Sequence, residues 1–263
     1  MQGFADQVAF VSGGASGIGL ALVEALIAQG ARVAIGDIDV GRARDIAERL
    51  GDRCMAVALD VADRTSWAQA RSDVEARFGG VDLLCNCAGI GGDGHPLVSV
   101  SPLSFDRVIA INLTGVYNGI AAFVGPMASR GRGHVVNIAS MAGLLPTPSL
   151  GAYAASKFAV VGLSETLREE VAGSGVGVTV VCPGRVLTRI DETTRAAGSD
   201  RAPVATIAAL RALEPSAVAK MTLAAVLANE PLVVTHAEFR PQTEARSRLL
   251  LEAFDRADAR DRA

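Results

Sequence analysis

Residues 7–19, Gln-Val-Ala-Phe-Val-Ser-Gly-Gly-Ala-Ser-Gly-Ile-Gly, join a short apolar run to a glycine-rich loop. The apolar run predicts a buried strand over Gln7–Ser12, and the pattern that follows predicts an amphipathic helix over Ile18–Gln29. Glycines in the loop let the backbone turn sharply and approach a ligand closely. The start of a helix also offers unpaired N–H groups and a positive dipole end, which suit a pyrophosphate. The stretch therefore predicts a strand-turn-helix unit whose turn binds a dinucleotide.

The loop departs from the commonest dinucleotide-binding spacing. Its glycines are arranged G-x-x-x-G-x-G rather than G-x-G-x-x-G. A glycine turn that binds no ligand is the alternative, and the strand before it and the helix after it argue against that alternative. In this loop we expect the cofactor to contact Gly13, Ser16, Gly17, Ile18 and Gly19.

Apolar, β-branched runs alternate with longer helical patterns along the chain. Further strands are expected at Arg32–Asp37, Cys54–Leu59, Leu83–Cys87, His134–Ala139, Val176–Cys182 and Leu232–Thr235. Further helices are expected at Gly41–Leu50, Ser66–Phe78, Leu113–Ser129 and Tyr153–Ala172. This alternation predicts an α/β fold, a doubly wound parallel sheet of about seven strands with helices on both faces and ligands at the strands' carboxyl ends. No repeat or linker interrupts the pattern, so residues 1–263 are expected to form a single domain.

Composition limits the classes of function. Of the 263 residues 50% are hydrophobic and 20% are charged, and the net charge of −3 argues against a nucleic-acid or anionic-membrane partner. No apolar run is expected to reach the about 18 residues of a membrane span, and the N-terminus lacks signal-peptide features, so a cytoplasmic protein is expected. Cys85-x-Cys87 has the wrong spacing for zinc, so no metal site is expected and all cysteines are interpreted as buried thiols.

Two acidic residues follow strands where an adenosine would lie. Asp37 ends the second strand, where a carboxylate bonds the ribose hydroxyls and repels a 2′-phosphate. Because neither Ile38 nor Ser16 supplies a cation, NAD is favoured over NADP. Asp60 and Val61, after the third strand, are expected beside the adenine, with Asp60 accepting from its amino group. A capping or turn role is the alternative for each aspartate.

Tyr153 and Lys157 stand four residues apart in a predicted helix, so their side chains share one face. A phenol titrates near ~10, and a neighbouring ammonium favours the phenolate, which suits proton transfer at neutral pH. Tyr-x-x-x-Lys alone is a common surface pattern. It becomes specific because Ser140 lies 13 residues upstream and the glycine loop precedes both.

Six motifs follow one another in the chain: Gly13-x-x-x-Gly17-x-Gly19, Asn86-Cys-Ala-Gly89, Asn112, Ser140, Tyr153-x-x-x-Lys157 and Pro183-Gly184. With them the sequence resembles the short-chain dehydrogenase/reductase family, closely over about residues 1–190 and more loosely beyond. The resemblance implies a Rossmann-type fold. It also implies hydride transfer between a nicotinamide cofactor and a carbonyl or alcohol.

The resemblance implies a chemical role for four residues. Tyr153 would act as general base in oxidation and as general acid in reduction. Lys157 would lower the tyrosine pKa and bind the nicotinamide ribose, while Ser140 would hydrogen-bond the substrate oxygen. Asn112 would interrupt its helix and hold a water that links Lys157 to solvent; an ordinary helix asparagine is the alternative.

The same resemblance places further residues at the cofactor. Asn86 and Gly89 would border its adenosine side, after the fourth strand. The residues expected at the nicotinamide are Pro183, Gly184, Val186 and Thr188. Thr188 would reach the carboxamide, although a helix cap is equally consistent with the bare motif.

The sequence departs from the family pattern at two places. Cys87 replaces the second asparagine of Asn-Asn-Ala-Gly, a change expected to spare the chemistry. The usual Asp-Gly-Gly ending of the last strand is absent, and residues 231–240 lead instead into an atypical tail, about residues 236–263, with a helix at Thr243–Phe254. This tail and the loop Ala139–Pro148 are similar to those of bacterial benzylic-alcohol (C-alpha) dehydrogenases of lignin aryl-ether breakdown.

The oligomeric state is open between a homodimer and a homotetramer. Apolar helices at Leu113–Ser129 and Tyr153–Ala172 would form a four-helix dimer face, but core packing explains the same pattern. The altered last strand argues against the family's usual 222-symmetric tetramer, because that strand commonly packs at one of its interfaces.

If the family geometry holds, the substrate pocket is lined by Ile90–Pro96, Met141–Leu150, Arg185 and a loop at about 187–214. Leu145 and its neighbours form an apolar wall that suits a hydrophobic alcohol. Arg185 and His95 are the polar candidates. Arg185 is expected either to pair with an acidic or phenolic group of the substrate, or to form a salt bridge with Asp191 or Glu192.

The favoured interpretation is an oxidoreductase that transfers a hydride between NAD and a small molecule, a hydrophobic and in some cases aromatic secondary alcohol or its ketone. One alternative is an NADPH-dependent carbonyl reductase, against which Asp37 argues. The other is a non-catalytic NAD-binding regulator, against which the presence of every expected reacting residue argues.

Overall fold

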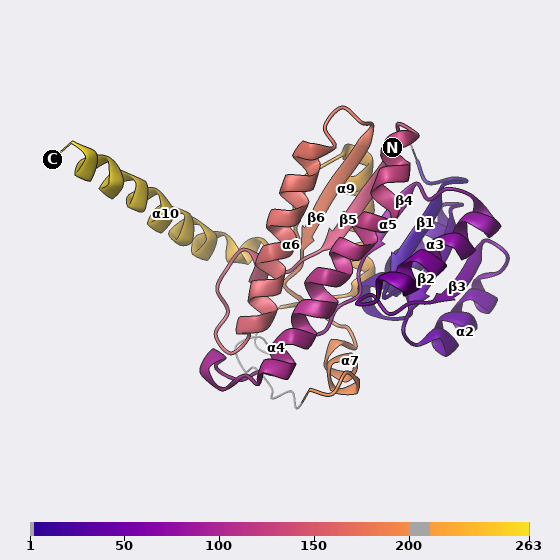
Figure 1. The fold of residues 1–263 in the computed structure, drawn as a ribbon, viewed down its shortest axis with the longest axis horizontal. Helices are drawn as coiled ribbons and strands as arrows, with labels where there is room; N and C mark the ends of the chain where they lie inside the picture. The colour runs from indigo at the N-terminus through magenta and orange to yellow at the C-terminus, as the bar shows by residue number, and fades with distance from the viewer. Residues whose placement is uncertain (1–2, 200–210, 263) are drawn as a thin grey trace.

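A seven-stranded parallel sheet forms the centre of the computed structural model, which describes residues 3–199 and 211–262 (Figure 1). Its order is β3-β2-β1-β4-β5-β6-β9. The strands are β1 (Val8–Ser12), β2 (Arg32–Asp37), β3 (Cys54–Ala58), β4 (Leu83–Asn86), β5 (Gly133–Ile138), β6 (Val176–Cys182) and β9 (Leu232–Val234). The chain order reverses direction between β1 and β4, which is where such sheets bind ligands. The predicted fold class and the predicted strands are confirmed.

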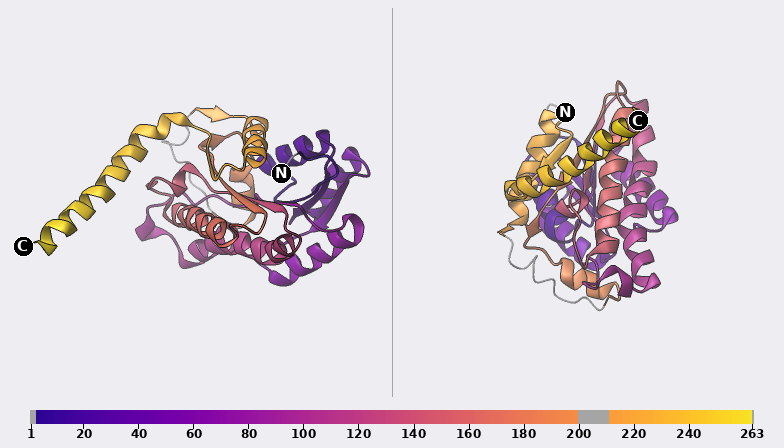
Figure 2. Two further views of the ribbon diagram at one scale, coloured as in Figure 1. Left: turned by 90° about the horizontal axis from the view of Figure 1, so that it is seen from above. Right: turned by 90° about the vertical axis from the view of Figure 1, so that its left-hand side faces the viewer.

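Helices cover both faces of the sheet (Figures 1 and 2). The helices are α1 (Gly17–Ala28), α2 (Val40–Leu50), α3 (Arg64–Phe78), α4 (Pro102–Ile109), α5 (Gly115–Ser129), α6 (Gly151–Glu170), α7 (Ile190–Ala196), α9 (Pro215–Ala228) and α10 (Arg240–Asp261). In β1, Phe10 packs with α3, α5 and α6, whereas Val11 packs with α1, α2 and α9. Both faces of β1 are therefore buried, as the continuous apolar run predicts.

A helix of 28 residues, Pro102–Ser129, contains a window with mean hydropathy 1.5. It consists of α4, a π-helical turn η2 (Ala110–Thr114) and α5, and so begins eleven residues before the predicted Leu113. The prediction that no segment is long and apolar enough to span a membrane is therefore wrong. Half of that window is buried inside the domain, where α5 packs on β4 and β5.

A small parallel ribbon follows β6. Its strands are β7 (Arg185–Val186) and β8 (Ala212–Leu213), and α7 lies between them in the chain. The predicted substrate loop at 187–214 falls partly on residues 200–210, which lie outside the described residues. The ribbon continues directly from the carboxyl end of β6, so it lies at the edge of the sheet where ligands are expected.

The chain ends in a long helix that leaves the body of the domain (Figures 1 and 2). After β9 a short turn, η4 (Ala237–Phe239), leads into α10, which extends the predicted helix Thr243–Phe254 at both ends. Four of its large apolar side chains are exposed: Leu249, Leu250, Leu251 and Phe254. Only the beginning of this helix lies against the rest of the domain.

Candidate functional site

A cavity of about 1190 Å³ opens at the carboxyl ends of the strands. It is lined by the residue that directly follows each of six strands, namely Gly13, Ile38, Leu59, Cys87, Ala139 and Pro183. Parallel strands bring all these turns to one edge of the sheet. The volume exceeds the roughly 1,000 Å³ upper limit that is usual for the cleft of one small ligand, and so leaves room for two ligands side by side.

The glycine loop forms the floor of this cavity, and three of its positions require glycine. Gly13 and Gly17 have φ angles of +65° and +53°, which side chains disfavour. A Cβ on Gly19 would lie 2.2 Å from the carbonyl oxygen of Gly13. The five loop residues predicted to contact the cofactor all line the cavity. The loop thus presents backbone and the start of α1 to a ligand, an arrangement that fits a pyrophosphate.

Asp37 stabilises the turn after β2, at the end of the cavity beside this strand. Its Oδ2 accepts from the backbone N–H of Ala15 at 3.0 Å, and its Oδ1 accepts from that of Asp39 at 3.0 Å. The carboxylate therefore makes a turn contact and also lines the cavity. The sequence reasoning missed Arg42, whose Nε donates to the carbonyl of Ala15 at 2.7 Å and which lines the same end. Arg42 could have been anticipated from its position in the first turn of α2, the helix that follows β2.

The turn after β3 also borders the cavity. Asp60 is exposed, and its Oδ1 accepts from the backbone N–H of Ala62 at 2.9 Å. Val61 is buried and lines the cavity beside it. The cap of α3 is Asp63, whose side chain accepts from Thr65. Asp60 is thus placed to reach a ligand while one oxygen stabilises the turn.

Tyr153 and Lys157 lie on one face of α6 and both line the cavity. The Lys157 Nζ is 5.7 Å from the centre of the Tyr153 ring and donates to the carbonyl of Ile138 at 2.9 Å. Lys157 is only 4% exposed. Burial lowers its pKa to about 8, although the sulfurs of Cys182 and Cys87 act in the opposite direction. Most Lys157 side chains therefore carry the ammonium charge at neutral pH and lose it as the pH rises through about 8.

Ser140 begins a short turn, η3 (Met141–Gly143), after β5. Its Oγ accepts from the backbone N–H of Ala142 at 3.1 Å and donates to the carbonyl of Pro183 at 3.4 Å. A Cβ on Gly143 would lie 2.6 Å from the carbonyl oxygen of Lys157, so η3 and α6 are in direct contact. This packing brings Ser140 to the same cavity as Tyr153 and Lys157.

Asn112 lies in the π-helical turn, so the predicted interruption of its helix is present. Its Oδ1 accepts from the backbone N–H of Ile90 at 2.9 Å, and its Nδ2 donates to the carbonyl of Ile90 and to Ser156 Oγ. The side chain is fully buried and is not among the described residues that line the cavity. A Cβ on Gly89 would lie 3.2 Å from Asn112 Oδ1 and 3.6 Å from Lys157 Nζ. Asn112 therefore supports the cavity wall beside Lys157.

Two predicted site residues lie elsewhere. Asn86 is 2% exposed and donates to Asn137 Oδ1 at 2.8 Å, on the face of the sheet that α5 covers. His95 is exposed, since its loop turns outward after Gly91 and Gly92. Neither is among the described residues that line the cavity. The structure therefore does not bring Asn86 and His95 to the cavity wall, and their roles as ligand contacts stay predictions.

The other predicted residues line the cavity: Gly89, Leu145, Pro183, Gly184, Arg185, Val186 and Thr188. Thr188 also packs against the glycine loop, because a Cβ on Gly17 would lie 3.1 Å from its methyl group. The loop after β5 supplies the expected apolar wall, which includes Pro146, Pro148 and Leu150.

The tail supplies a wall that the sequence did not assign to the site. Its cavity-lining residues are Phe239, Gln242, Ala245 and Arg246. The guanidinium of Arg246 lies over the ring of Phe158, 5.0 Å from its centre, and forms no ion pair with any residue in the described ranges. The atypical composition of the tail was visible in the sequence, but its direction of packing was not.

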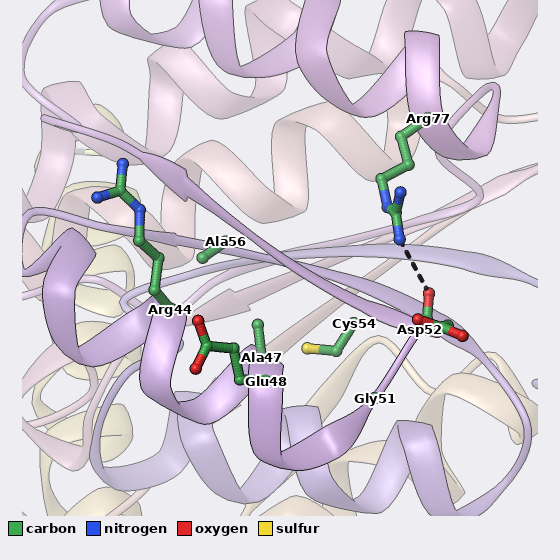
Figure 3. A pocket seen from close by; sticks show the side chains of 8 residues that line it. All are labelled: Arg44, Ala47, Glu48, Gly51, Asp52, Cys54, Ala56 and Arg77. Atoms are coloured by element: carbon green, nitrogen blue, oxygen red, sulfur yellow. Dashed lines mark hydrogen bonds between the residues drawn. The ribbon is translucent and has the colours of Figure 1, made fainter.

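A smaller hollow of about 270 Å³ lies at the opposite end of β3 (Figure 3). It lies between α2, the end of α3 and the turn Gly51–Asp52, where Arg77 donates to the carbonyl of Asp52 at 3.5 Å. Cys54 lines it, and burial raises the pKa of this thiol to about 11. Because it opens at the amino ends of the strands and contains no motif residue, it is separate from the candidate site.

Known proteins with similar sequences share this architecture. A family model described as short chain dehydrogenase matches residues 7–198. The probable oxidoreductase EphD of Mycobacterium tuberculosis is 38% identical over 87% of this chain, which spans 41% of that longer protein. The 3-alpha-(or 20-beta)-hydroxysteroid dehydrogenase of the same species is 40% identical, over 69% of this chain and 70% of its own. The C alpha-dehydrogenase of Sphingobium sp. is 37% identical, over 74% and 65%.

Solved structures agree with these sequence matches. A short chain dehydrogenase/reductase from Burkholderia phymatum, crystallised in complex with NAD, superposes with a TM-score of 0.88. It is 30% identical, and the superposition covers 96% of this chain and 97% of the other. This agreement extends over both the glycine-loop half and the tail half of the fold. The chain therefore belongs to the short-chain dehydrogenase family of oxidoreductases.

Proposed function

We propose that this protein transfers a hydride between NAD and a hydrophobic secondary alcohol or its ketone. The observation that carries the proposal is the convergence of Ser140, Tyr153 and Lys157 on the cavity whose floor is the glycine loop. These groups come from two different elements, and the tight contact of η3 with α6 holds them together. Bound at the glycine loop, the nicotinamide cofactor would supply the hydride acceptor or donor.

The residues of the chain would handle the proton and the developing charge. In oxidation the Tyr153 phenolate would take the hydroxyl proton of the substrate, and in reduction the phenol would return it. The buried Lys157 ammonium, directed by its bond to Ile138, would favour the phenolate electrostatically. The Ser140 hydroxyl would turn from the carbonyl of Pro183, its weak 3.4 Å acceptor, to donate its single proton to the substrate oxygen where negative charge develops. Each role uses an atom that already borders the cavity.

Asp37 supports NAD as the cofactor. Its carboxylate is fixed by two backbone N–H groups at the adenosine end, so it cannot turn away from a 2′-phosphate without losing both bonds. The Burkholderia phymatum neighbour was crystallised with NAD. A specific observation favours an NADPH-dependent carbonyl reductase as the second candidate, because Arg42 places a guanidinium at the same end. The charge of Asp37 supports NAD instead, since Arg42 is directed to the carbonyl of Ala15.

The cavity walls support a hydrophobic substrate. Leu145, Pro146 and Pro148 face the substrate end, and Phe239 adds an aromatic ring from the tail. The relatives' names include a hydroxysteroid dehydrogenase, which indicates an alcohol on a large apolar skeleton, and a C alpha-dehydrogenase. We therefore expect steroidal or benzylic secondary alcohols to be better substrates than short aliphatic ones.

The test is a panel of secondary alcohols and their ketones assayed with NAD and NADP in parallel. The proposal predicts cofactor reduction with NAD and a preference for bulky apolar alcohols. A strong preference for NADP would favour the carbonyl reductase. Tight NAD binding without turnover of any alcohol or ketone would favour a non-catalytic binding protein.

A further inference from the structure

A buried histidine stands where β9 ends. His236 is 2% exposed, and its Nδ1 accepts from the backbone N–H of Gly184 at 3.1 Å. Because Nδ1 is an acceptor there, the proton of the neutral ring resides on Nε2, which lies 3.3 Å from the carbonyl oxygen of Arg211. Thr235 Oγ1 lies 2.7 Å from the same Nδ1, so its hydroxyl shares the single lone pair of that nitrogen with the Gly184 N–H. Both ring nitrogens are therefore used to bind backbone.

The two backbone groups belong to the two strands of the small ribbon. Gly184 directly precedes β7, and Arg211 directly precedes β8. The ring also packs flat on Gly184, since a Cβ there would lie 2.7 Å from the His236 Cγ. One side chain thus attaches the start of both ribbon strands to the end of the main sheet.

The ribbon carries residues at the proposed nicotinamide end of the cavity. Arg185 and Val186 form β7, and Thr188 follows it and packs against Gly17 of the glycine loop. All three line the cavity, whereas His236 does not. His236 also stacks edge-on with Phe239, 6.3 Å between centroids, which lines the substrate end. The histidine is therefore placed to act on ligands only through the groups it holds.

We propose that His236 is a positioning residue that sets the segment Pro183–Thr188 against the nicotinamide half of the cofactor. The inference rests on the proposed dinucleotide function. The essential contact is the Gly184 N–H to Nδ1 bond, because a displaced Gly184 moves β7 and Thr188 with it. The bond to Arg211 holds the second strand and is expected to matter less for the cofactor. Adenosine contacts, which come from the opposite side of the glycine loop, are independent of the ring.

Substitutions of His236 can separate the Nδ1 bond to Gly184 from the Nε2 bond to Arg211. His236→Asn offers an acceptor near the position of Nδ1, while His236→Gln offers a donor near Nε2 but no acceptor for Gly184. His236→Phe keeps the flat ring and the stacking on Phe239 and removes both bonds. Affinities for NADH and for ADP-ribose, which lacks the nicotinamide, are measured for each protein by titration. Thermal unfolding of each variant reports separately on the fold.

The proposal predicts NADH binding about tenfold weaker in the Gln and Phe variants, the cost of leaving a buried N–H unpaired, with His236→Asn close to wild type. ADP-ribose should bind all four proteins equally. Unchanged NADH binding in His236→Gln, or an equal loss for both ligands, would overturn the positioning role. If His236→Phe does not fold, comparing NADH binding by His236→Asn and His236→Gln still tests the positioning role.

The same experiment separates this inference from the proposed function. Wild-type protein that binds NADPH in place of NADH refutes the cofactor assignment, and the comparison then proceeds with NADPH and 2′-phospho-ADP-ribose. Wild-type protein that binds neither dinucleotide refutes the proposed function and, with it, the positioning role. Wild-type binding of NADH with no difference among the variants refutes the positioning role alone.

Discussion

The ammonium of Lys157 lies 5.7 Å from the centre of the Tyr153 ring, one helical turn along α6. The lysine is anchored to the carbonyl of Ile138 at the end of β5, so the pair is fixed to the sheet as well as to its own helix. A charge held at this distance in a buried site acts on the phenol with little screening. The proposed proton transfer depends on this arrangement.

Replacing Lys157 should change how stability depends on pH. Burial lowers the folded pKa of Lys157 to about 8 from its ordinary value of 10.5, so above pH 8 the unfolded chain binds more protons than the folded protein. The contribution of Lys157 to the free energy of unfolding therefore rises with pH between those two values. Relative to Lys157→Met, wild type should gain about 2 kcal/mol between pH 7.5 and 9.5 in urea unfolding. A pH-independent difference would show that the ammonium is not destabilised by burial.

Gly19→Ala should disable the cofactor loop. The added Cβ would lie 2.2 Å from the carbonyl oxygen of Gly13, a backbone atom that moves only if the loop moves. NADH affinity is expected to fall at least about tenfold, which corresponds to a loss of about 1.4 kcal/mol of binding free energy. Gly162→Ala is the matched control, because a Cβ there meets no atom within 4 Å on α6. Equal NADH titrations for both variants would contradict the role of the loop.

Cofactor choice should respond to Asp37. Asp37→Asn keeps one of the two acceptor oxygens, loses one of the two backbone bonds, and removes the charge that repels a 2′-phosphate, while Arg42 remains nearby. The ratio of kcat/KM for NADP to that for NAD should rise about tenfold or more, a change of about 1.4 kcal/mol in transition-state binding. The double variant Asp37→Asn with Arg42→Ala should lose most of that gain. An unchanged ratio in the single variant would remove Asp37 from the discrimination.

Arg246, in the tail helix α10, should affect the binding of substrate rather than the binding of cofactor. Arg246→Ala removes a guanidinium from the cavity wall, so KM for substrates that carry a carboxylate should rise several-fold, the cost of about 1 kcal/mol in an exposed charge pair. KM for neutral alcohols and the affinity for NADH should stay near wild type. Arg248→Ala on the same helix is the control, since Arg248 is exposed and is not among the described lining residues. Equal effects of the two substitutions would indicate a general charge effect.

The sheet was predictable because buried parallel strands are read as continuous β-branched runs. β2 and β6 have the predicted bounds. Each of the other predicted strands differs from the observed strand by one or two residues, counted over both ends. The helix α9 was not predicted, because Pro215–Ala228 is rich in alanine and lacks the polar face that marks an amphipathic helix. The start of Pro102–Ser129 was missed because residues 102–107 are exposed or only half-buried and so lack a continuous apolar face.

The candidate site was predictable where a motif fixes backbone geometry. The glycine loop and Tyr153-x-x-x-Lys157 determine their own local shape, and the five predicted loop contacts, Tyr153 and Lys157 line one cavity. Side-chain direction was not determined in the same way, so Asn86 was assigned to the cavity although it bonds to Asn137 inside the sheet layer. The tail wall depends on long-range contacts such as His236 with Gly184, which no local pattern encodes.

The most direct test of the proposed chemistry compares wild type with Tyr153→Phe in NAD reduction by a good secondary alcohol. The phenyl ring keeps the packing on α6 and loses only the proton-carrying oxygen, so NADH affinity should remain and kcat should fall by at least about 100-fold, the usual range for a general acid–base group. Retention of wild-type kcat in Tyr153→Phe, with NADH still bound, would contradict the assignment of Tyr153 as the group that moves the proton.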